Sequence, residues 1–257
     1  MKAVILAGGL GSRLAEETSV RPKPMVEIGG KPLLWHLLKI LGTQGIDDFV
    51  ICTGYKGYLI KEYFANYLFH TADFTVDLKN GRVEMHDGHV DPWRVSIIDT
   101  GEQTNTGGRI RRIRHLLDDS DEPFLLTYGD GLADVDLGAL RRFHDAHGRR
   151  ATVTAVQPPG RFGALSLDGD AVTRFTEKPQ GDGAWISGGF FLLDPSVVDL
   201  IEDDDTSWES GPLEQLAAAG QLAAYRHDGY FQPCDTLRDK HVLERLWDTG
   251  KAPWRNW

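Results

Sequence analysis

Short apolar runs alternate along the chain with longer stretches in which apolar residues recur at helical spacing. The apolar runs that we interpret as strands comprise residues 3–6, 49–52, 124–127 and 151–156. The helical stretches between them comprise residues 33–41, 58–67 and 137–147. Such alternation is typical of a mainly parallel sheet flanked by helices. We therefore predict an α/β fold built on a Rossmann-like sheet.

Two segments depart from this alternation. Residues 74–98 contain turn dipeptides at 80–81 (Asn-Gly) and 87–88 (Asp-Gly), and residues 164–175 surround an Asp-Gly at 168–169. These dipeptides favour the tight turns of hairpins rather than long crossovers. We expect each segment to leave the main sheet as a small β excursion.

The last third of the chain predicts one strand and two helices, at residues 185–193, 213–219 and about 235–247. No internal repeat or long linker interrupts the pattern, so we predict one domain over residues 1–257. Indoles near a terminus tend to be docked rather than left in water. We expect Trp254 and Trp257 to pack on this subunit or on another, and with the hairpin segment 74–98 they favour a homo-oligomer.

The chain is acidic, with 28 Lys and Arg against 38 Asp and Glu and a formal net charge of −10. Such a field repels polyanions and argues against a nucleic-acid-binding protein. Neither Cys52 nor Cys234 lies in a metal-ligand spacing, which favours a reduced, cytoplasmic protein. The apolar start of the chain is too short to span a bilayer and is cut off by glycines, so no membrane segment is expected.

The first predicted strand runs directly into a glycine-rich loop from Ala7 to Leu14. Ligands bind at the carboxyl ends of strands in open α/β sheets, and glycines let backbone N–H groups approach a phosphate or a base. A simple tight turn would use the same residues. Leu14 stands where a dinucleotide fingerprint needs glycine, and Arg13-Leu14 stands where a P-loop needs Gly-Lys, so the spacing excludes both motifs.

Two cations follow within a short span. Arg13 places a planar donor fork at the mouth of the loop, which suits phosphate oxygens. Lys23 lies between Pro22 and Pro24, which restrict the backbone on both sides of it. By itself Lys23 would be an ordinary solvated lysine. Together with the glycine loop and Arg13 it favours a phosphate site.

Two aspartates are candidates for binding a divalent cation. Asp130 lies between two glycines at the end of a predicted strand, where it is either a turn residue or a ligand of Mg²⁺, which prefers oxygen ligands. Asp134 and Asp136 are nearby rivals, although Asp136 better fits the N-cap of the following helix. Asp235 by itself is an N-cap of the closing helix, and it could serve in both ways.

The segments LAGGLGSRL and RPKPMVEIGGKPLLWH resemble the signature of the sugar-phosphate nucleotidyltransferases, in which a G-G-x-G-[ST]-R-L loop precedes a [KR]-P-K-P-[ML] segment. The resemblance continues through TGGR, FLLTYGDGLADVD, TAVQPPGRFGAL, EKPQGDGAWISGGFF and GYFQPCDTLRDK. It covers nearly the whole chain. Within the family it is greatest to the subgroup that uses CTP and glucose 1-phosphate.

The resemblance implies four sets of site residues and one cofactor, Mg²⁺. The catalytic residues would be Arg13, Lys23 and Asp130, and the metal ligands Asp130 and Asp235. The nucleotide would contact Leu6, Ala7, Gly8, Gly9, Gly11, Ser12, Arg13, Lys23, Thr104, Thr106, Arg109 and Gly129. The sugar phosphate would contact Gly163, Glu177, Lys178, Gly188 and Gly189. Without the resemblance, the Glu177-Lys178 pair would be a solvated loop.

The implied activity is cytidylyl transfer from CTP to glucose 1-phosphate, with CDP-glucose and pyrophosphate as products. UTP or dTTP could replace CTP, because base choice depends on a few hydrogen bonds that motif spacing does not reveal. A regulatory module that binds nucleotide without catalysis is a further alternative, since fold does not fix function. An oxidoreductase is disfavoured by Leu14.

Overall fold

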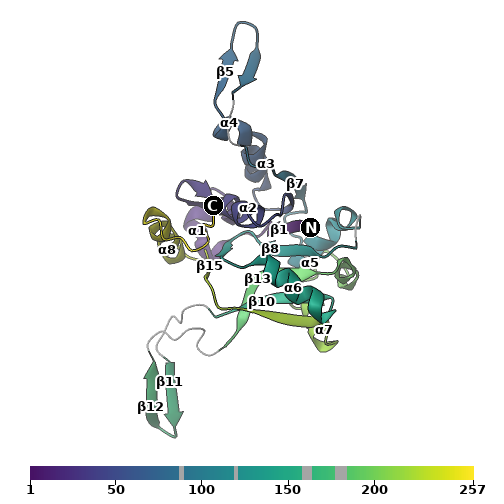
Figure 1. Cartoon of the computed structure of the whole chain (residues 1–257), viewed down its shortest axis with the longest axis vertical. Helices are drawn as coiled ribbons and strands as arrows, with labels where there is room; N and C mark the ends of the chain where they lie inside the picture. Colours follow the sequence, from purple (N-terminus) through teal and green to yellow (C-terminus); the bar gives the residue numbers. More distant parts are fainter. Residues whose placement is uncertain (87–89, 119–120, 158–163, 177–183) are drawn as a thin grey trace.

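The computed structural model describes residues 1–86, 90–118, 121–157, 164–176 and 184–257. Its centre is a seven-stranded sheet in the order β14-β10-β13-β8-β1-β4-β7 (Figure 1). The strands are β1 (Lys2–Ala7), β4 (Asp48–Thr53), β7 (Arg94–Asp99), β8 (Phe124–Tyr128), β10 (Ala151–Val156), β13 (Ile186–Leu193) and β14 (Leu222–His227). Only β13 runs antiparallel to its neighbours in this sheet. The predicted mainly parallel α/β sheet is confirmed.

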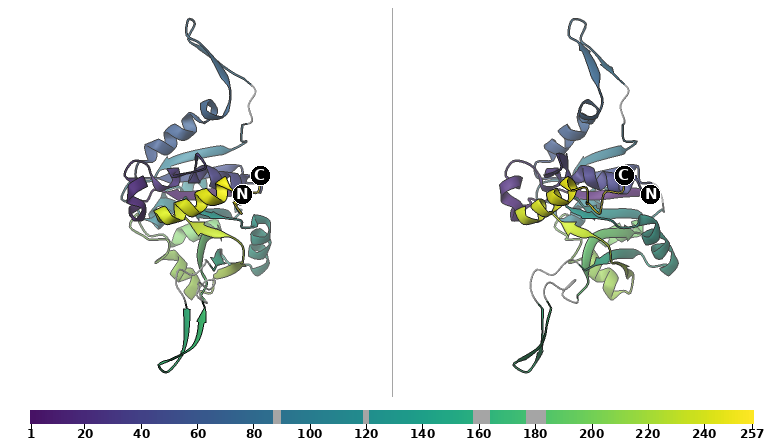
Figure 2. Two further views of the ribbon diagram at one scale, coloured as in Figure 1. Left: turned by 90° about the vertical axis from the view of Figure 1, so that its left-hand side faces the viewer. Right: turned by 60° about the vertical axis from the view of Figure 1, so that its left-hand side comes forward.

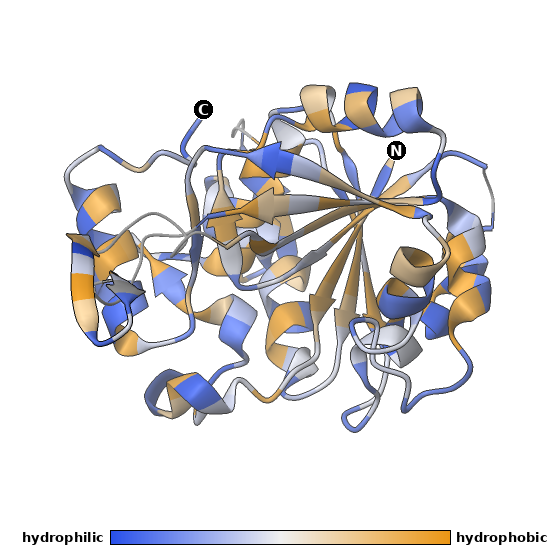
Figure 3. Cartoon of the chain, turned by 90° about the horizontal axis from the view of Figure 1, so that it is seen from below, coloured by the Kyte–Doolittle hydropathy of each residue, from blue (hydrophilic) through white to orange (hydrophobic). Residues whose placement is uncertain are grey.

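Helices cover both faces of the sheet, because side chains of a strand point alternately to its two sides. Ala3 and Ile5 of β1 pack in a core with α2, α3 and α6, whereas Val4 packs on the opposite face with α5 and α7. Figure 3 shows the resulting apolar centre of the sheet. The helices are α1 (Ala15–Thr18), α2 (Leu33–Gly42), α3 (Gly57–Ala65), α4 (Tyr67–Thr71), α5 (Thr106–Arg112), α6 (Leu137–His147), α7 (Pro212–Ala218) and α8 (Leu237–Asp248).

Within the described residues, four two-stranded ribbons accompany the main sheet, and two of them project from opposite ends of the molecule (Figure 2). The projecting ribbons are β5 (Phe74–Asp77) with β6 (Arg82–Met85), and β11 (Ala164–Asp168) with β12 (Ala171–Thr176). The smaller ones are β2 (Glu27–Ile28) with β3 (Lys31–Pro32), and β9 (Gly131–Ala133) with β15 (Phe231–Pro233). The expected β excursions are therefore present.

One part of the first excursion was assigned wrongly. Residues 94–98 were included in the hairpin segment, but they belong to β7, which pairs in parallel with β4 and forms an edge of the main sheet. Local turn signals identify a strand without identifying its partner, because pairing depends on residues far away in the sequence. The second expected turn, at residues 87–88, lies outside the described residues.

The C-terminal segment docks on its own subunit. Trp254 is fully buried, stacks on Tyr230 and donates its indole N–H to Nδ1 of His36 at 3.4 Å. Trp257 lies edge-on to Trp35, with ring centroids 5.8 Å apart. Of the two options left open by the sequence, packing on this subunit holds for both indoles.

Candidate active site

The carboxyl ends of β1 and β8 lie level with one another, because Leu6 is in register with Tyr128. The glycine loop follows β1 and Gly129-Asp130 follows β8, so both segments reach the same edge of the sheet. The backbone N–H of Gly129 donates to the carbonyl of Leu6 at 3.0 Å. A Cβ at Gly129 would lie 2.8 Å from Pro24, so glycine is required where these segments meet.

Arg109 of α5 fixes the glycine loop from behind. Its guanidinium is almost fully buried and donates to the carbonyl of Gly8 at 3.1 Å and to that of Thr53 at 3.0 Å. It also donates to Thr100 Oγ1 at 2.8 Å and to the carbonyl of Gly101 at 2.7 Å. A Cβ at Gly8 would lie 2.1 Å from this guanidinium, which explains the glycine. Burial lowers the pKa of Arg109, yet these acceptors hold its charge in place.

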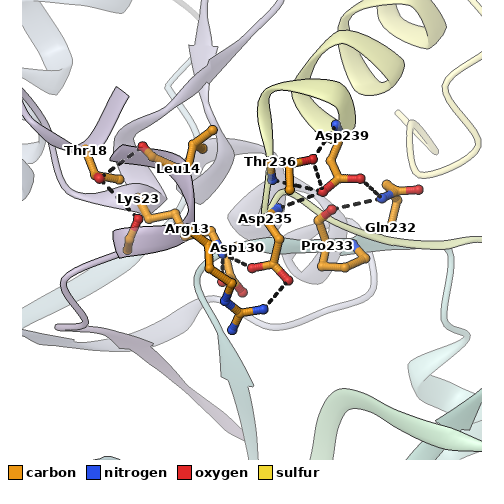
Figure 4. Close-up of polar contacts among 11 residues, drawn as sticks. Arg13, Leu14, Thr18, Lys23, Asp130, Gln232, Pro233, Asp235, Thr236 and Asp239 are labelled. Atoms are coloured by element: carbon orange, nitrogen blue, oxygen red, sulfur yellow. Dashed lines mark hydrogen bonds and ion pairs between the residues drawn. The ribbon is translucent and has the colours of Figure 1, made fainter. Parts of the chain in front are cut away.

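Lys23 lies between two carboxylates that come from distant parts of the chain (Figure 4). Its Nζ donates to Asp130 Oδ2 at 2.6 Å and to Asp235 Oδ1 at 2.5 Å. Arg13 Nη1 donates to the other oxygen of Asp235 at 2.9 Å. The lysine side chain is 11% exposed and that of Arg13 is 77% exposed, so Lys23 forms the floor of the cluster and Arg13 its open rim.

Local structure brings Asp235 to Asp130. Strand β15 pairs with β9, and just beyond that pair the backbone N–H of Cys234 donates to the carbonyl of Asp130 at 2.9 Å. The following helix α8 is capped by Thr236 and Asp239 in a capping box, which leaves the Asp235 side chain free to face Lys23. The expectation that Asp235 caps α8 is therefore wrong by one residue. Asp136 does cap α6, accepting from the N–H of Ala139 at 2.8 Å.

The two carboxylates keep Lys23 charged. Burial acts to lower its pKa, but the charge and hydrogen bond of Asp130, followed by those of Asp235, outweigh that effect and leave the pKa above its usual value. Lys23 is therefore a permanent cation at neutral pH.

The same carboxylates are suited to a divalent cation. Asp130 and Asp235 converge on one Nζ, so a positive charge is already stabilised between them. Among the described residues, no group of three or more His, Cys, Asp or Glu side chains could hold a metal ion. Mg²⁺ commonly takes one or two carboxylates and completes its shell with water and substrate phosphates, so this pair fits it.

A cavity of about 370 Å³ opens beside the glycine loop. Every residue predicted to bind the nucleotide lines it, namely Leu6, Ala7, Gly8, Gly9, Gly11, Ser12, Arg13, Lys23, Thr104, Thr106, Arg109 and Gly129. Asn105, Pro24, Tyr128 and Asp130 complete the wall. The structure thus gathers these residues around one space, and their role in binding stays a prediction.

A second cavity, of about 390 Å³, shares part of its wall with the first. Gly188 and Gly189, predicted to contact the sugar phosphate, line it together with Asp235. Arg13, Tyr128 and Asp130 line both cavities. Gly163, Glu177 and Lys178 lie outside the described residues.

Tyr128 and Glu209 are site residues that the sequence interpretation missed. The Tyr128 ring lies against Gly189, which has a φ of 73°, and a Cβ at that position would lie 2.8 Å from the ring, so glycine is required there. The Tyr128 hydroxyl donates to Glu209, which lines the second cavity. The position of Tyr128 just before Gly129-Asp130 could have revealed it, but Glu209 lies in an irregular segment with no local signal.

Comparison with known proteins agrees with this arrangement. The profile of the nucleotidyl transferase family matches residues 2–251. The chain belongs to the nucleotidyl transferase family.

Individual relatives indicate which members of the nucleotidyl transferase family this chain resembles. The glucose-1-phosphate cytidylyltransferase of Salmonella typhi is 59% identical over 257 residues, which is 100% of each chain. That of Salmonella typhimurium is also 59% identical over 257 residues and 100% of each chain. The crystal structure of HddC from Yersinia pseudotuberculosis has a TM-score of 0.67 at 24% identity, covering 96% of this chain and 99% of that one, and supports the fold alone.

Proposed function

We propose that the chain transfers a cytidylyl group from CTP to α-D-glucose 1-phosphate, giving CDP-glucose and pyrophosphate. Two relatives named for this activity are 59% identical over the full length of both chains, which supports the choice of substrates. The observation that carries the proposal is the position of Lys23. It is held between Asp130 and Asp235, where two cavities meet at shared residues.

The proposed reaction exchanges one phosphoanhydride for another. The attacking oxygen belongs to a phosphate monoester that is already ionised at neutral pH, so no general base is needed. The protein has to bring two polyanions together and hold them in line. The formal net charge of −10 makes such an approach unfavourable except at a local cationic patch.

Each charged residue has a separate task in this proposal. Arg13, at the open rim, would bind phosphate oxygens of the departing pyrophosphate, and Lys23 would neutralise charge from below. Mg²⁺ held by Asp130 and Asp235 would supply Lewis-acid stabilisation of the phosphate oxygens. The backbone N–H groups of the glycine loop would face the nucleotide, with Arg109 keeping the loop in place.

The sugar 1-phosphate is assigned to the second cavity, with Gly188 and Gly189 in its wall. Gly163, Glu177 and Lys178 keep the roles that family resemblance implies, with Lys178 on the phosphate. Tyr128 separates this ligand from the nucleotide, since it lines both cavities.

Pyrophosphate release from purified protein with Mg²⁺ and glucose 1-phosphate tests the proposal. CTP, UTP, dTTP, GTP and ATP are compared at equal concentrations, and we expect kcat/KM to be highest for CTP. A preference for UTP or dTTP would change the nucleotide substrate that we assign but not the type of reaction. Nucleotide binding without pyrophosphate release from any triphosphate would overturn the reaction in favour of a regulatory module.

We also propose that the chain is cytoplasmic and assembles as a homo-oligomer. The β5–β6 ribbon exposes Phe74, Val76 and Val83, and such apolar side chains on a projecting ribbon favour burial against another subunit. Among the described residues, no helix has the length and apolar character needed to cross a bilayer.

A further inference from the structure

Glu209 is fixed in the wall of the second cavity by backbone packing around α5. The N–H of Gly107 donates to the carbonyl of Thr206 at 3.0 Å. A Cβ at Gly108 would lie 2.4 Å from the carbonyl oxygen of Asp204, so glycine is what permits this approach. The close contact sets the position of the segment that carries Glu209.

Three hydroxyl groups orient the Glu209 carboxylate. Thr106 Oγ1 donates to its Oε2 at 2.6 Å and Ser207 Oγ donates to the same oxygen at 2.8 Å. The Tyr128 hydroxyl donates to Oε1. The Thr106 hydroxyl in turn accepts from the backbone N–H of Trp208 at 2.9 Å, so its direction is also fixed.

The carboxylate keeps the capacity to accept a further hydrogen bond. A carboxylate has about four lone-pair sites, and of the three hydroxyl groups that donate to it in the described part of the chain, only that of Tyr128 reaches Oε1. Partial burial acts to raise the pKa of Glu209, but the hydrogen bonds from Thr106, Tyr128, its own backbone N–H and Ser207 outweigh it and leave the pKa below its usual value. Glu209 is therefore an ionised acceptor at neutral pH.

The wall of the second cavity carries both positive and negative charges. Arg13, at one part of its wall, is a cation suited to a phosphate. The negative charges of Asp130 and Asp235 are paired with the Lys23 ammonium group. Glu209 carries a negative charge that repels phosphate but accepts hydrogen bonds from neutral hydroxyl groups.

We propose that Glu209 accepts a hydrogen bond from a ring hydroxyl of the hexose in the second cavity and so helps determine which sugar phosphate is used. The Tyr128 hydroxyl, which gives its proton to Glu209, keeps an acceptor lone pair beside it. Opposite charges at Glu209 and Arg13 would orient the substrate, with hydroxyls toward the carboxylate and phosphate toward the guanidinium. This inference rests on the proposed function, since it assumes a hexose 1-phosphate in this cavity.

The test compares removal of the acceptor, the Glu209 carboxylate, with removal of the donor, a single hydroxyl group of the sugar. Glu209→Ala and Glu209→Gln are assayed with CTP and with glucose 1-phosphate or its 2-, 3-, 4- and 6-deoxy analogues. We expect wild-type kcat/KM to fall on the order of 10- to 100-fold for one of the four analogues, as for a lost hydrogen bond to a charged group. Glu209→Ala should lose a similar factor with glucose 1-phosphate and lose nothing further with that analogue.

Ser207→Ala is the matched control, because Ser207 bonds the same carboxylate but lines neither cavity. It should discriminate among the analogues as the wild type does. Calorimetry provides a readout independent of turnover: Glu209→Ala should weaken binding of CDP-glucose and leave that of CTP unchanged, which also shows that the variant is folded.

The outcomes separate this inference from the proposed function. If the wild type releases no pyrophosphate from CTP and glucose 1-phosphate, the proposed function fails. If the wild type is active but Glu209→Ala still discriminates among the four analogues as the wild type does, Glu209 contacts no hydroxyl and only this inference is overturned. If Glu209→Ala lost affinity for CTP and for CDP-glucose equally, the inference would also be overturned, and the role of Glu209 would be to maintain the structure of the nucleotide cavity.

Discussion

Two lysines in this protein are similarly buried and similarly paired, yet their surroundings differ. The Lys23 side chain is 11% exposed and contacts Asp130 and Asp235, whereas that of Lys39 is 14% exposed and contacts Asp91 at 2.7 Å. Burial and ion pairing therefore do not distinguish them. What distinguishes them is what else surrounds each ammonium group besides its carboxylate partners.

Lys39 lies in an aromatic enclosure. Its Nζ lies 5.7 Å from the ring centroid of Trp35, 5.9 Å from that of Trp93 and 6.0 Å from that of Trp257. Asp91 also accepts from the hydroxyl of Tyr67 at 2.6 Å. Lys23 instead lines a cavity whose wall also includes Arg13. The comparison teaches that the same ion pair serves stability where it is enclosed and is available to a ligand where it borders open space.

The largest effect is expected at the open site. Lys23→Ala and Asp130→Ala should each lower kcat at least ~10³-fold, about 4 kcal/mol of barrier, because each removes a fixed charge from the phosphate site. Neither residue belongs to a hydrophobic core cluster, so the fold should remain. Pyrophosphate release measures the loss, and circular dichroism verifies the fold.

Lys61→Ala is the control for these two variants, since Lys61 is an exposed lysine of α3 and lines neither cavity. Its kcat should equal that of the wild type. A wild-type rate in Lys23→Ala would remove the functional difference between Lys23 and Lys39.

The enclosed lysine should show the opposite behaviour. Lys39→Met should lower the free energy of unfolding by about 3 kcal/mol, the lower end of the range for breaking a buried pair, because it leaves Asp91 without a counter-charge. Its kcat should be unchanged, since Lys39 lines neither cavity. Urea denaturation gives the free energy, and the pyrophosphate assay gives kcat.

Lys31→Met is matched to Lys39→Met, because the Lys31 ammonium lies over the same Trp35 ring at 5.7 Å. An exposed cation–π contact contributes at most about 1 kcal/mol, so this control should be nearly as stable as the wild type. If both variants lose the same stability, the ring contacts rather than the Asp91 pair stabilise the enclosure. A large fall in kcat for Lys39→Met would contradict the division between the two regions.

The sequence predicted most of the open site because its signals are local. The glycine loop directly follows β1, and Asp130 directly follows β8, so an edge-of-sheet argument made both of them candidates, and the family resemblance favoured a site over a simple turn. Lys23 was recognisable from its two flanking prolines only together with the glycine loop and Arg13. Its partners were not, because the Lys23–Asp235 contact joins residues 212 positions apart.

The features that the sequence did not reveal depend on long-range packing. Arg94–Asp99 joins the main sheet through pairing with β4, which no local turn signal specifies. Glu209 reaches the site because residues 204–206 pack on the glycines of α5. The enclosure of Lys39 likewise assembles rings from three segments, and Trp257 comes from the far end of the chain. Periodicity predicts that such residues are buried but not what they meet.

A third prediction extends the comparison to pH. His36 borders the enclosure of Lys39, with its ring centroid 5.1 Å from that of Trp35. Burial lowers its pKa from 6.5 to about 4, opposed by the hydrogen bond from Nε2 to the Ile28 carbonyl at 2.8 Å and assisted by Arg255 and Lys31. A proton on Nδ1 would face the indole N–H of Trp254, which already donates to that nitrogen.

The sign of the effect follows from proton uptake. Between pH 6.5 and about 4 the unfolded chain binds a proton at His36 and the native chain does not, so stability falls as the pH is lowered through this window. The native state should lose about 2 kcal/mol at pH 5 relative to pH 8 through this residue. His36→Gln keeps an N–H for Ile28 but does not titrate, so its free energy of unfolding should depend less on pH by that amount. Parallel urea denaturation of both proteins at pH 5 and pH 8 measures the difference. If the free energies of unfolding of the two proteins depended equally on pH, His36 would protonate inside the aromatic cluster without a loss of stability. The region around Lys39 would then not be shielded from solvent, and its contrast with the open site of Lys23 would fail.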